Sequence, residues 1–396
     1  MQRVLHVVEN LNHGAVENWL LRMLRFGRRS GASMDWTFYC ALGARGRLDE
    51  QARALGARVI HSPVPIGRKV DFVRGLRAEL RRGKYDVLHC HHDIVSAVYL
   101  LAAAGIPIST RIVHVHNADE AVLTRSRFKR LVYREPARRV CLALADRIVG
   151  ISNHTLDTFL AGRARRLGQH VVHYYGVDPA PFANATGDRA AFRRQLGLPA
   201  DALILLFAGR VVPEKNPMFA IDVLAELRRI DPRSIAVFAG AGSQEHAVLA
   251  RARELDVEDS VRMLGWQDDL AEIMSCSDWF ILPRVEHPME GFGLAVVEAQ
   301  LAGLRMLLSA GIADDPLLPT ASYQRLPLAA GARTWAQAAA QLLHGRAASP
   351  DETRAALEAS PFAMKTALAE LISLHQENDL SFCKHTRKQV PRPSSP

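Results

Sequence analysis

Short apolar strands and helical segments alternate along most of this chain, and this alternation constrains its fold more than any other feature. β-Branched apolar runs such as VLHVVEN (4–10) are followed by stretches with apolar residues at helical spacing, such as 17–29. Such runs are typical of parallel strands buried on both faces and joined by crossover helices. The series continues with strand 35–41, helix 47–55, strand 57–61, helix 71–82, strand 85–90, helix 94–104, strand 109–116 and strand 145–152.

The alternation lapses at 175–187, where Gly, Asp, Pro and Asn gather, and then starts again. The expected elements are strand 202–209, helix 218–229, strand 234–240, helix 244–255 and strands 260–265, 278–283 and 304–310. We therefore predict an α/β protein with two doubly wound, Rossmann-like domains facing across a cleft. Their expected bounds are 1–180 and 186–360, followed by a terminal helix (361–380) packing back toward the first domain and a flexible tail (381–396).

Basic residues are concentrated in the first half of a chain that carries 50 Lys and Arg against 41 Asp and Glu, a formal charge of +9. One cluster lies within 121–140 and a second within 68–84. These clusters can be solvated helix faces, or they can form a patch that contacts the inner membrane surface. Nucleic-acid binding is the weakest interpretation, because the sequence holds no recognisable nucleic-acid-binding motif.

The location of the protein is predicted from its apolar runs and its cysteines. The longest apolar run, 94–108, is shorter than the about 20 residues that a membrane-spanning helix needs. The N-terminus lacks the pattern of a signal peptide. The five cysteines are scattered and odd in number, which favours a reducing compartment. We expect a cytoplasmic protein that can associate with the inner face of the cytoplasmic membrane.

The segment AGRVVPEKNP (208–217) places two cations after a buried strand and before a helix. The guanidinium of Arg210 can donate hydrogen bonds to two oxygens of a diphosphate, and Lys215 can place a positive charge beside them. The alternative is an ordinary charged surface loop. We favour a diphosphate site, because the helix that follows begins with backbone N–H groups that also attract anions.

The segment EGFGLAVVEAQLAG (290–303) combines two carboxylates with a glycine-rich helix start. Glu298 lies two turns into an otherwise apolar helix, where a carboxylate is costly unless hydrogen-bond donors such as sugar hydroxyls meet it. The backbone of the turn preceding the helix can face a phosphate or a sugar ring. A capped helix with a solvated Glu would explain either half of the segment alone. The predicted ligand-binding positions here are Glu290, Gly291, Phe292, Gly293, Leu294 and Glu298.

Residues 202–310 resemble the donor-binding half of the retaining GT-B glycosyltransferases of family 4. The matching elements are Gly209-Arg210, Glu214-Lys215-Asn216, Ser277-Asp278 through Pro283, and the Glu290…Glu298 pair in its E-G-F-G-L context. The resemblance implies that Arg210 and Lys215 bind the diphosphate. It also implies that Glu290 contacts the donor sugar and that Glu298 binds the ribose. It also places Gly240 and Gly242 beside the nucleotide.

The first half resembles the acceptor domain of the same family, and the resemblance spans about residues 1–345. LNHGAVENWLL (11–21) matches the family's N-terminal glycine turn, with Gly14 as the first glycine and Ala15 in place of the second. His116 matches the active-site histidine. Tyr175 stands where the hinge motif usually has Asn, and Arg284 stands where the family often has Ser.

The resemblance implies transfer of a hexose from a UDP- or GDP-sugar to a saccharide acceptor, expected to be lipid-linked, in bacterial surface-polysaccharide synthesis. Configuration is retained, with the departing phosphate acting as base, and the predicted catalytic residues are His116, Glu290, Arg210 and Lys215. No metal or cofactor is expected, since the sequence has no Asp-x-Asp pair and its histidine pairs (89 and 91, 114 and 116) lack a fixed partner ligand.

Two other functions remain open from the sequence. A GT-B epimerase would share the fold and would interconvert nucleotide sugars without an acceptor. A degenerate transferase acting as a scaffold would bind nucleotide without turnover, and the departures at Ala15, Tyr175 and Arg284 are the features that favour it.

Overall fold

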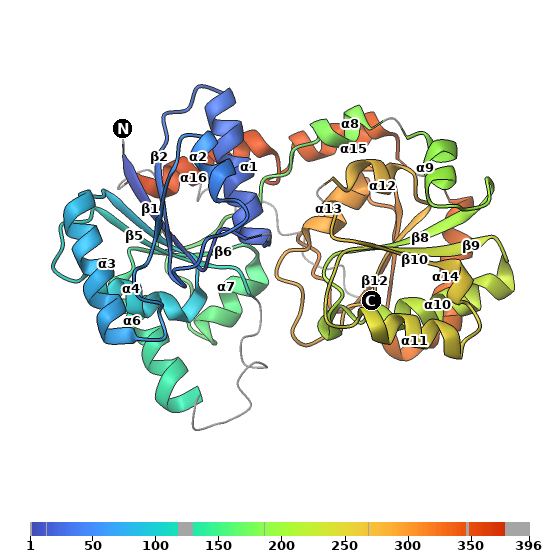
Figure 1. Ribbon diagram of the computed structural model, residues 1–396, viewed down its shortest axis with the longest axis horizontal. Coiled ribbons are helices and arrows are strands. Elements are labelled where there is room, and N and C mark those ends of the chain that lie inside the picture. The colour runs from blue at the N-terminus through green and yellow to red at the C-terminus, as the bar shows by residue number, and fades with distance from the viewer. Residues whose placement is uncertain are drawn as a thin grey trace. The chain divides into compact units, whose positions relative to one another are not determined.

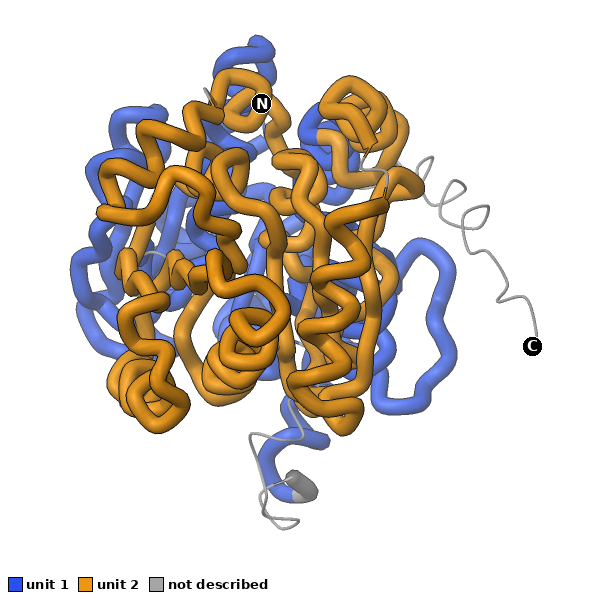
Figure 2. The backbone as a smooth tube through the Cα atoms, turned by 90° about the vertical axis from the view of Figure 1, so that its right-hand side faces the viewer, with its two compact units in different colours: residues 1–176, 364–396 blue, residues 177–363 orange. Residues whose placement is uncertain are grey.

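The computed structural model describes residues 2–12, 14–117, 130–185, 187–267, 269–345 and 348–376. The chain divides into two compact units (Figures 1 and 2). Unit 1 comprises residues 1–176 and 364–396, and unit 2 comprises residues 177–363. Figure 2 colours unit 1 blue and unit 2 orange. The prediction of two parallel-sheet, Rossmann-like α/β domains is confirmed.

Unit 1 is built on a parallel sheet of seven strands in the order β3-β2-β1-β4-β5-β6-β7. The strands are β1 (Arg3–Val8), β2 (Asp35–Cys40), β3 (Arg58–His61), β4 (Val87–Cys90), β5 (Thr110–Val115), β6 (Arg147–Gly150) and β7 (His170–Val172). The helices are α1 (Ala15–Arg29), α2 (Asp49–Ala54), α3 (Lys69–Gly83), α4 (Ser96–Ala103), α6 (Glu135–Leu144), α7 (Asn153–Leu160) and α16 (Met364–His375), with a 3-10 turn at Asp93–Val95 and a π turn at Arg130–Arg134.

The two faces of this sheet carry different side chains, because neighbouring residues of a strand point to opposite faces. Leu5, Leu88 and Val113 join the apolar cluster formed with α3, α4 and α6. The residues next to them, His6, His89 and His114, therefore point to the opposite face, where Trp19 of α1 and His375 of α16 meet them. One face of the unit 1 sheet is apolar and the other is lined with imidazole.

Unit 2 is built on a parallel sheet of six strands in the order β10-β9-β8-β11-β12-β13. The strands are β8 (Leu203–Ala208), β9 (Ser234–Ala239), β10 (Val261–Gly265), β11 (Trp279–Leu282), β12 (Arg305–Ser309) and β13 (Tyr323–Leu326). The helices are α8 (Ala180–Asn184), α9 (Arg189–Gln195), α10 (Pro217–Ile230), α11 (Glu245–Glu254), α12 (Ala271–Ser275), α13 (Leu294–Leu301), α14 (Gly331–His344) and α15 (Pro350–Glu358), with 3-10 turns at Pro213–Lys215, Glu258–Ser260 and Leu328–Ala330.

The segment predicted as a terminal helix, 361–380, contains α16, which belongs to unit 1 although unit 2 precedes it in the chain. Arg147 of β6 holds its C-terminal end: Nη1 donates to the carbonyls of Ser373 (3.0 Å) and Leu374 (2.6 Å), and Nη2 donates to that of Gln376 (2.7 Å). The last carbonyls of a helix lack the N–H donors of a following turn. The guanidinium of the buried Arg147 supplies donors at this end, and the Ser373 carbonyl also accepts from the Gln376 N–H at 3.1 Å. The predicted tail, 381–396, lies outside the described residues.

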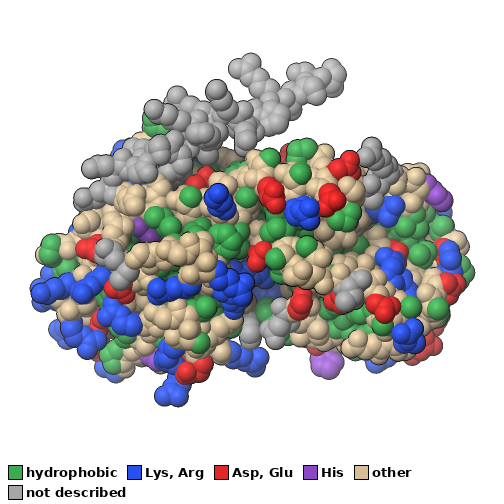
Figure 3. All heavy atoms as spheres, turned by 90° about the horizontal axis from the view of Figure 1, so that it is seen from above, with side chains coloured by type: hydrophobic (Ala, Val, Ile, Leu, Met, Phe, Trp, Pro, Cys, Tyr) green, Lys and Arg blue, Asp and Glu red, His purple; other side chains and the backbone are tan. Residues whose placement is uncertain are grey.

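The basic segment 68–84 forms α3 with the residue on either side of it, and part of its charge is paired locally. Arg68 and Arg74 both contact Asp71, at 2.7 and 3.5 Å, and Arg77 donates to the carbonyl of Ala102 at 2.9 Å. On the face drawn in Figure 3, basic side chains lie interspersed with acidic and apolar ones. Of the second basic cluster, 121–140, residues 121–129 lie outside the described residues. Within the described residues, no helix is long and apolar enough to cross a membrane.

Arg147→Ala should destabilise the protein, because it removes the charged donor that joins β6 to the carbonyls of Ser373, Leu374 and Gln376. Hydrogen bonds from a charged donor contribute about 1.5–3 kcal/mol each, so we expect a loss of about 3 kcal/mol, measured by urea unfolding. The matched control is Arg229→Ala, because Arg229 is a solvent-exposed member of an i,i+3 ion pair and should change stability by less than about 0.5 kcal/mol. Equal unfolding midpoints for Arg147→Ala and the native protein would show that these bonds do not fasten α16.

Candidate functional site

The predicted donor-binding residues of unit 2 gather where the carboxyl ends of its central strands meet. The chain passes from β8 outward through β9 and β10, and then returns to β11 on the other side of β8. The edge between β8 and β11 is therefore the topological switch point, where parallel α/β sheets bind ligands. Arg210 and Lys215 follow β8, and Glu290 follows β11.

Backbone hydrogen bonds join the loops at this edge to one another. The Val285 N–H donates to the Glu214 carbonyl at 3.0 Å, which links the loops after β8 and β11. The Glu290 N–H donates to the Gly311 carbonyl at 2.9 Å, which ties the β11 loop to the loop after β12. The charged side chains are thus carried by a connected framework.

Gly240 and Gly242 serve this framework by close packing. A Cβ on Gly240 would lie 1.9 Å from the Gly209 carbonyl oxygen, and one on Gly242 would lie 2.2 Å from that of Val211. The Gly242 N–H already donates to Glu245 Oε1 at 2.7 Å. These contacts give both glycines a structural role, and their contact with a nucleotide stays a prediction.

Glu290 forms the centre of a buried group of charges. Its Oε1 lies 3.6 Å from Lys215 Nζ, and its Oε2 lies 2.9 Å from Arg284 Nη1. The contact with Arg284 is electrostatic rather than a directional hydrogen bond, since Oε2 has no hydrogen-bond donor. Other N–H groups of the same guanidinium donate to the carbonyls of Pro288 (2.9 Å) and Met289 (3.2 Å).

The pKa of Glu290 is set by two opposing effects. Burial acts to raise it, but the positive charges of Lys215, Arg284 and Arg210 outweigh burial and lower the pKa below its ordinary value. Glu290 is therefore an ionised carboxylate in a largely enclosed position, 17% exposed. Arg210 differs from the other two cations in being exposed, so its charge acts on Glu290 while its head group faces solvent.

The other predicted residues of this segment lie on or just before α13. Gly293 adopts a left-handed conformation (φ 85°) at the N-cap of the helix, which explains a glycine there. Phe292 is buried and packs against Phe362, with ring centroids 5.3 Å apart. Glu298 is buried at 8% exposure, as its place on an apolar helix predicts. Gly291 and Leu294 are half-buried.

In unit 1, Gly14 is the N-cap of α1 and Ala15 is the first residue of the helix. A Cβ on Gly14 would lie 2.1 Å from Glu17 Oε2, so the carboxylate of Glu17 folds back over the glycine. Burial, with a smaller contribution from the charge of Glu9, raises the pKa of Glu17 to about 7. The Ala15 side chain is exposed.

His116 is buried, and both of its ring nitrogens have partners. Its Nδ1 shares a hydrogen bond with the Tyr175 hydroxyl (2.7 Å), and its Nε2 shares one with His91 Nδ1 (3.0 Å). Its backbone N–H donates to Asp93 Oδ1 at 2.8 Å. Burial, then the neighbouring His92 and His173, lower the pKa of His116 to about 3, so the ring is neutral near pH 7.

The direction of this hydrogen-bond chain follows from its far end. His91 Nε2 shares a hydrogen bond with His6 Nδ1 (3.1 Å), while His6 Nε2 is buried without a partner. An unpaired N–H there would cost more than an unpaired ring lone pair, so the proton of His6 belongs on Nδ1. His6 then donates to His91, His91 donates to His116, and His116 donates to the Tyr175 oxygen.

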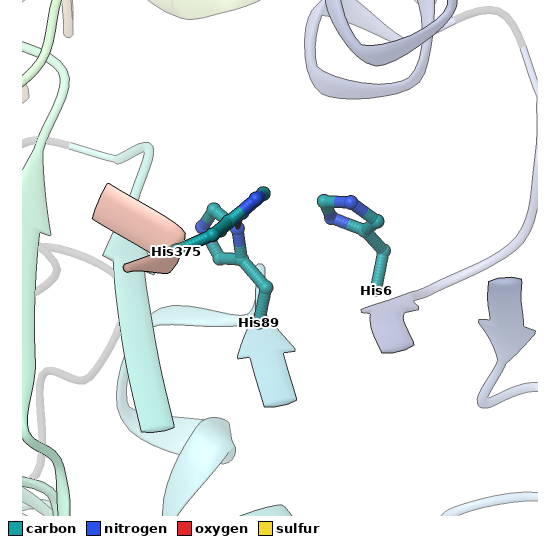
Figure 4. A group of neighbouring side chains, drawn as sticks. All are labelled: His6, His89 and His375. Atoms are coloured by element: carbon teal, nitrogen blue, oxygen red, sulfur yellow. Dashed lines mark hydrogen bonds between the residues drawn. The ribbon is translucent and has the colours of Figure 1, made fainter. Parts of the chain in front are cut away.

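These residues are part of a larger cluster on the imidazole-lined face of the unit 1 sheet. His89 is the centre of a second chain of hydrogen bonds. Its Nδ1 shares one with His375 Nε2 (3.1 Å), and its Nε2 shares one with His114 Nδ1 (3.1 Å). Figure 4 shows how β1, β4 and α16 bring His6, His89 and His375 together. The cluster contains seven buried histidines: His6, His89, His91, His114, His116, His173 and His375.

Comparison with known proteins identifies the family. The family model described as glycosyl transferases group 1 matches residues 188–313, and the one described as glycosyltransferase family 4 matches residues 16–181. The D-inositol 3-phosphate glycosyltransferase of Actinosynnema mirum is 32% identical over 304 residues, which are 70% of this chain and 69% of that enzyme. The chain belongs to the GT-B glycosyltransferases of the family 4 type. The predicted family resemblance is confirmed.

Other relatives of this glycosyltransferase span most of its length. The putative glycosyltransferase EpsF of Bacillus subtilis is 29% identical over 356 residues, covering 86% of this chain and 87% of EpsF. An Escherichia coli UDP-Gal:α-D-GlcNAc-diphosphoundecaprenol α-1,3-galactosyltransferase is 25% identical over 275 residues (66% and 67%). The crystal structure of Anabaena HepE with UDP and glucose has a TM-score of 0.74 at 17% identity, covering 94% of this chain and 98% of HepE, and so shares the fold.

The structure adds two residues to the sites of this glycosyltransferase that the sequence alone did not single out. Arg284 contacts Glu290, although from the sequence it was only a departure from the family pattern. Glu17 covers Gly14. The only sign of Glu17 in the sequence was that it lies within the N-terminal motif 11–21. Lys215, Glu290 and Arg210 act together in unit 2, while Gly14 and His116 lie in unit 1.

The histidine cluster should make the stability of the glycosyltransferase fall as the pH drops below about 6.5. Burial lowers the folded-state pKa of all seven histidines, to about 4 for His173 and about 3 for His116 and His375. The unfolded chain therefore binds more protons, and each histidine approaches a loss of about 1.4 kcal/mol per pH unit below 6.5. Glu17 and Glu370, whose pKa burial raises to about 7, act with the opposite sign, but they are two groups against seven.

Urea unfolding at pH 7.5, 6.5 and 5.5 measures this effect above the range where ordinary carboxylates titrate. The urea midpoint should fall as the pH is lowered across the series. In His375→Asn it should fall less steeply, because one of the seven histidines no longer contributes to the pH dependence. His246→Ala, which removes an exposed histidine, is the control that should leave the slope unchanged. A midpoint that stays constant between pH 7.5 and 5.5 would contradict the neutral, buried state of the cluster.

Proposed function

We propose that this glycosyltransferase transfers a hexose from a UDP- or GDP-sugar to a saccharide acceptor, with retention of configuration and without a metal ion. The observation that carries the proposal is the group formed by Lys215, Arg284 and Glu290 beside the exposed Arg210, at the switch point of the unit 2 sheet. This group combines fixed positive charge with one ionised acceptor.

Fixed positive charge suits the leaving group of the reaction. Breaking the bond between the anomeric carbon and the diphosphate builds negative charge on the departing phosphate. Arg210, whose head group faces solvent, and Lys215, at the end of the same loop, would bind that diphosphate. Because the charges are already in place, little reorganisation is needed when the bond breaks.

Glu290 would contact the donor sugar. Sugar hydroxyls are hydrogen-bond donors, and Oε2 is a buried carboxylate oxygen with no donor of its own. The lowered pKa keeps this oxygen an acceptor throughout the neutral range. Glu298 is proposed to hold the ribose, as in the family that the sequence resembles.

The proposed mechanism needs no protein nucleophile. The acceptor hydroxyl attacks from the side of the leaving group, its oxygen bonds to the anomeric carbon, and its proton passes to the departing phosphate. His116 is neutral near pH 7 and engaged on both nitrogens, so its proposed contribution is a positioned, uncharged ring.

The identity of the donor and acceptor rests on the relatives. The HepE structure contains UDP and glucose, which supports a UDP-sugar as donor. The E. coli relative is named for a diphosphoundecaprenol-linked acceptor, which supports a lipid-linked saccharide in surface-polysaccharide synthesis. We therefore propose that the reaction takes place at the inner face of the cytoplasmic membrane and that the basic segments of unit 1 contact the lipid.

Replacing the proposed diphosphate and sugar contacts should lower turnover strongly. Arg210→Ala, Lys215→Ala and Glu290→Gln should each reduce kcat/KM by about 100- to 1,000-fold, which is typical for removal of one preorganised group. The measurement is release of nucleoside diphosphate in the presence of an acceptor. Arg229→Ala, an exposed arginine on α10 of the same unit, should retain native activity. Full turnover by Arg210→Ala or Glu290→Gln would refute the assignment of the site.

A thermal-shift series with UDP, GDP and their sugar conjugates in EDTA tests the donor and the absence of a metal. One nucleotide class should raise Tm in EDTA, because a ligand at 100 times its Kd adds about 2.7 kcal/mol of stability, and Arg210→Ala should lose the shift. A shift that requires Mg²⁺ would contradict metal independence. Binding without any turnover would favour the scaffold, and isomerised donor formed without acceptor would favour the epimerase.

A further inference from the structure

Three groups of metal-ligating side chains come together within the described part of unit 1. They are His6 with His89 and His375 (Figure 4), His89 with His91 and His114, and Cys40 with Asp49 and His61. In each group one ligand atom per residue lies within 4.8 Å of the others, close to the about 3.5 Å that separates the ligands of a tetrahedral zinc ion. The distances therefore do not distinguish the three groups as candidate metal sites, but their charges do.

The two histidine groups suit a divalent cation poorly. Every member is fully buried and neutral, so the charge of a bound dication would remain uncompensated in an apolar interior. The positive charge of Arg147 already acts on His375.

The group of Cys40, Asp49 and His61 has the opposite electrostatics. A thiolate and a carboxylate together carry two negative charges, which cancel those of Zn²⁺, and a neutral imidazole adds a third ligand. Cys40 is the last residue of β2, Asp49 is the first of α2 and His61 is the last of β3. The parallel pairing of β2 with β3 sets Cys40 directly opposite His61.

The hydrogen bonding of Asp49 points independently to a missing ligand. Its Oδ2 shares a 2.7 Å hydrogen bond with His61 Nε2, but its Oδ1 is buried without any partner, and the residue is only 3% exposed. A buried carboxylate oxygen without a donor is costly, and a cation would satisfy it. The side chain of His61 is 21% exposed, which offers an entry path from solvent.

We propose that Cys40, Asp49 and His61 form a binding site for a thiophilic divalent cation of the Zn²⁺ type. Cys40 Sγ, Asp49 Oδ1 and an imidazole nitrogen of His61 bond to the ion, with water in the fourth position. The Cys40 thiol releases its proton to solvent as the S–metal bond forms. The site lies outside the proposed donor-binding residues and does not depend on the proposed function.

Occupation of this site would stiffen the loop between β2 and α2. The Leu48 N–H donates to the Leu11 carbonyl at 2.8 Å, and the Arg47 N–H donates to Asn12 Oδ1 at 3.1 Å. A Cβ on Gly46 would lie 2.1 Å from the Leu11 oxygen. A cation bonded to Cys40 and Asp49, at the two ends of this loop, would brace it against residues 11 and 12, which lead toward Gly14.

Titration with Co²⁺ tests the site directly, because a cobalt–thiolate bond produces a charge-transfer absorption in the near ultraviolet that histidine ligands alone do not. The background protein carries Cys383→Ser, since Cys383 lies outside the described residues. We expect the absorption in this protein and in the control Cys276→Ala, which removes another buried thiol, and we expect its loss in Cys40→Ala. No absorption at saturating Co²⁺, or an equal one in Cys40→Ala, would overturn the proposal.

Two milder variants decide the question if Cys40→Ala fails to fold. His61→Ala, at a partly exposed position, and Asp49→Asn each remove one ligand while keeping the thiol. Each should weaken Co²⁺ binding by at least the about 10–100-fold that loss of an outer-shell partner causes. Each should also lose the rise in Tm that Zn²⁺ gives the native protein. Unchanged affinity in both variants would overturn the proposal, since the metal would then be bound elsewhere.

Discussion

A parallel sheet must be covered on both faces, and the carboxyl ends of its strands all meet at one edge. In each unit these two constraints decide where polar chemistry can be placed. In unit 2 both faces are apolar, and the group formed by Lys215, Arg284 and Glu290 lies in the strand-end loops, where its charges compensate one another. In unit 1 polar groups also enter one face of the sheet, and they have to find partners among themselves.

The two buried polar groups solve the problem of burial differently. Around Glu290, a carboxylate keeps its charge because three cations surround it, which leaves a strong field at the switch point of the sheet. In unit 1, the seven histidines stay neutral. Six of them share protons along chains of hydrogen bonds, and His173 bonds to the Ala367 carbonyl. The first arrangement can act on a charged ligand, whereas the second holds the ring of His116 and the hydroxyl of Tyr175 in fixed positions.

Local sequence patterns predicted the fold class and the positions of most strands, because alternating apolar runs and helical spacing are local properties. β7 was not among the predicted strands. The motifs also located Lys215 and Glu290, whose partnership is now visible. β13 and α15 lack a strong apolar pattern and were not predicted. The pairing of Arg284 with Glu290 depends on how the loop between them bends, which the sequence pattern does not record. The contact of His6 with His375 depends on how distant segments of the chain meet. The same holds for Cys40, Asp49 and His61, whose spacing matches no metal motif.

The position of α16 has a consequence for the order in which the chain can fold. Unit 2 is continuous from residue 177 to residue 363, whereas unit 1 lacks the helix that covers its histidine-lined face until residue 375 has been made. During synthesis from the N-terminus, His6, His89 and Arg147 must wait for contacts with residues encoded more than two hundred positions later. Unit 2 can complete its core first, so the domain that begins the chain is the last to be finished.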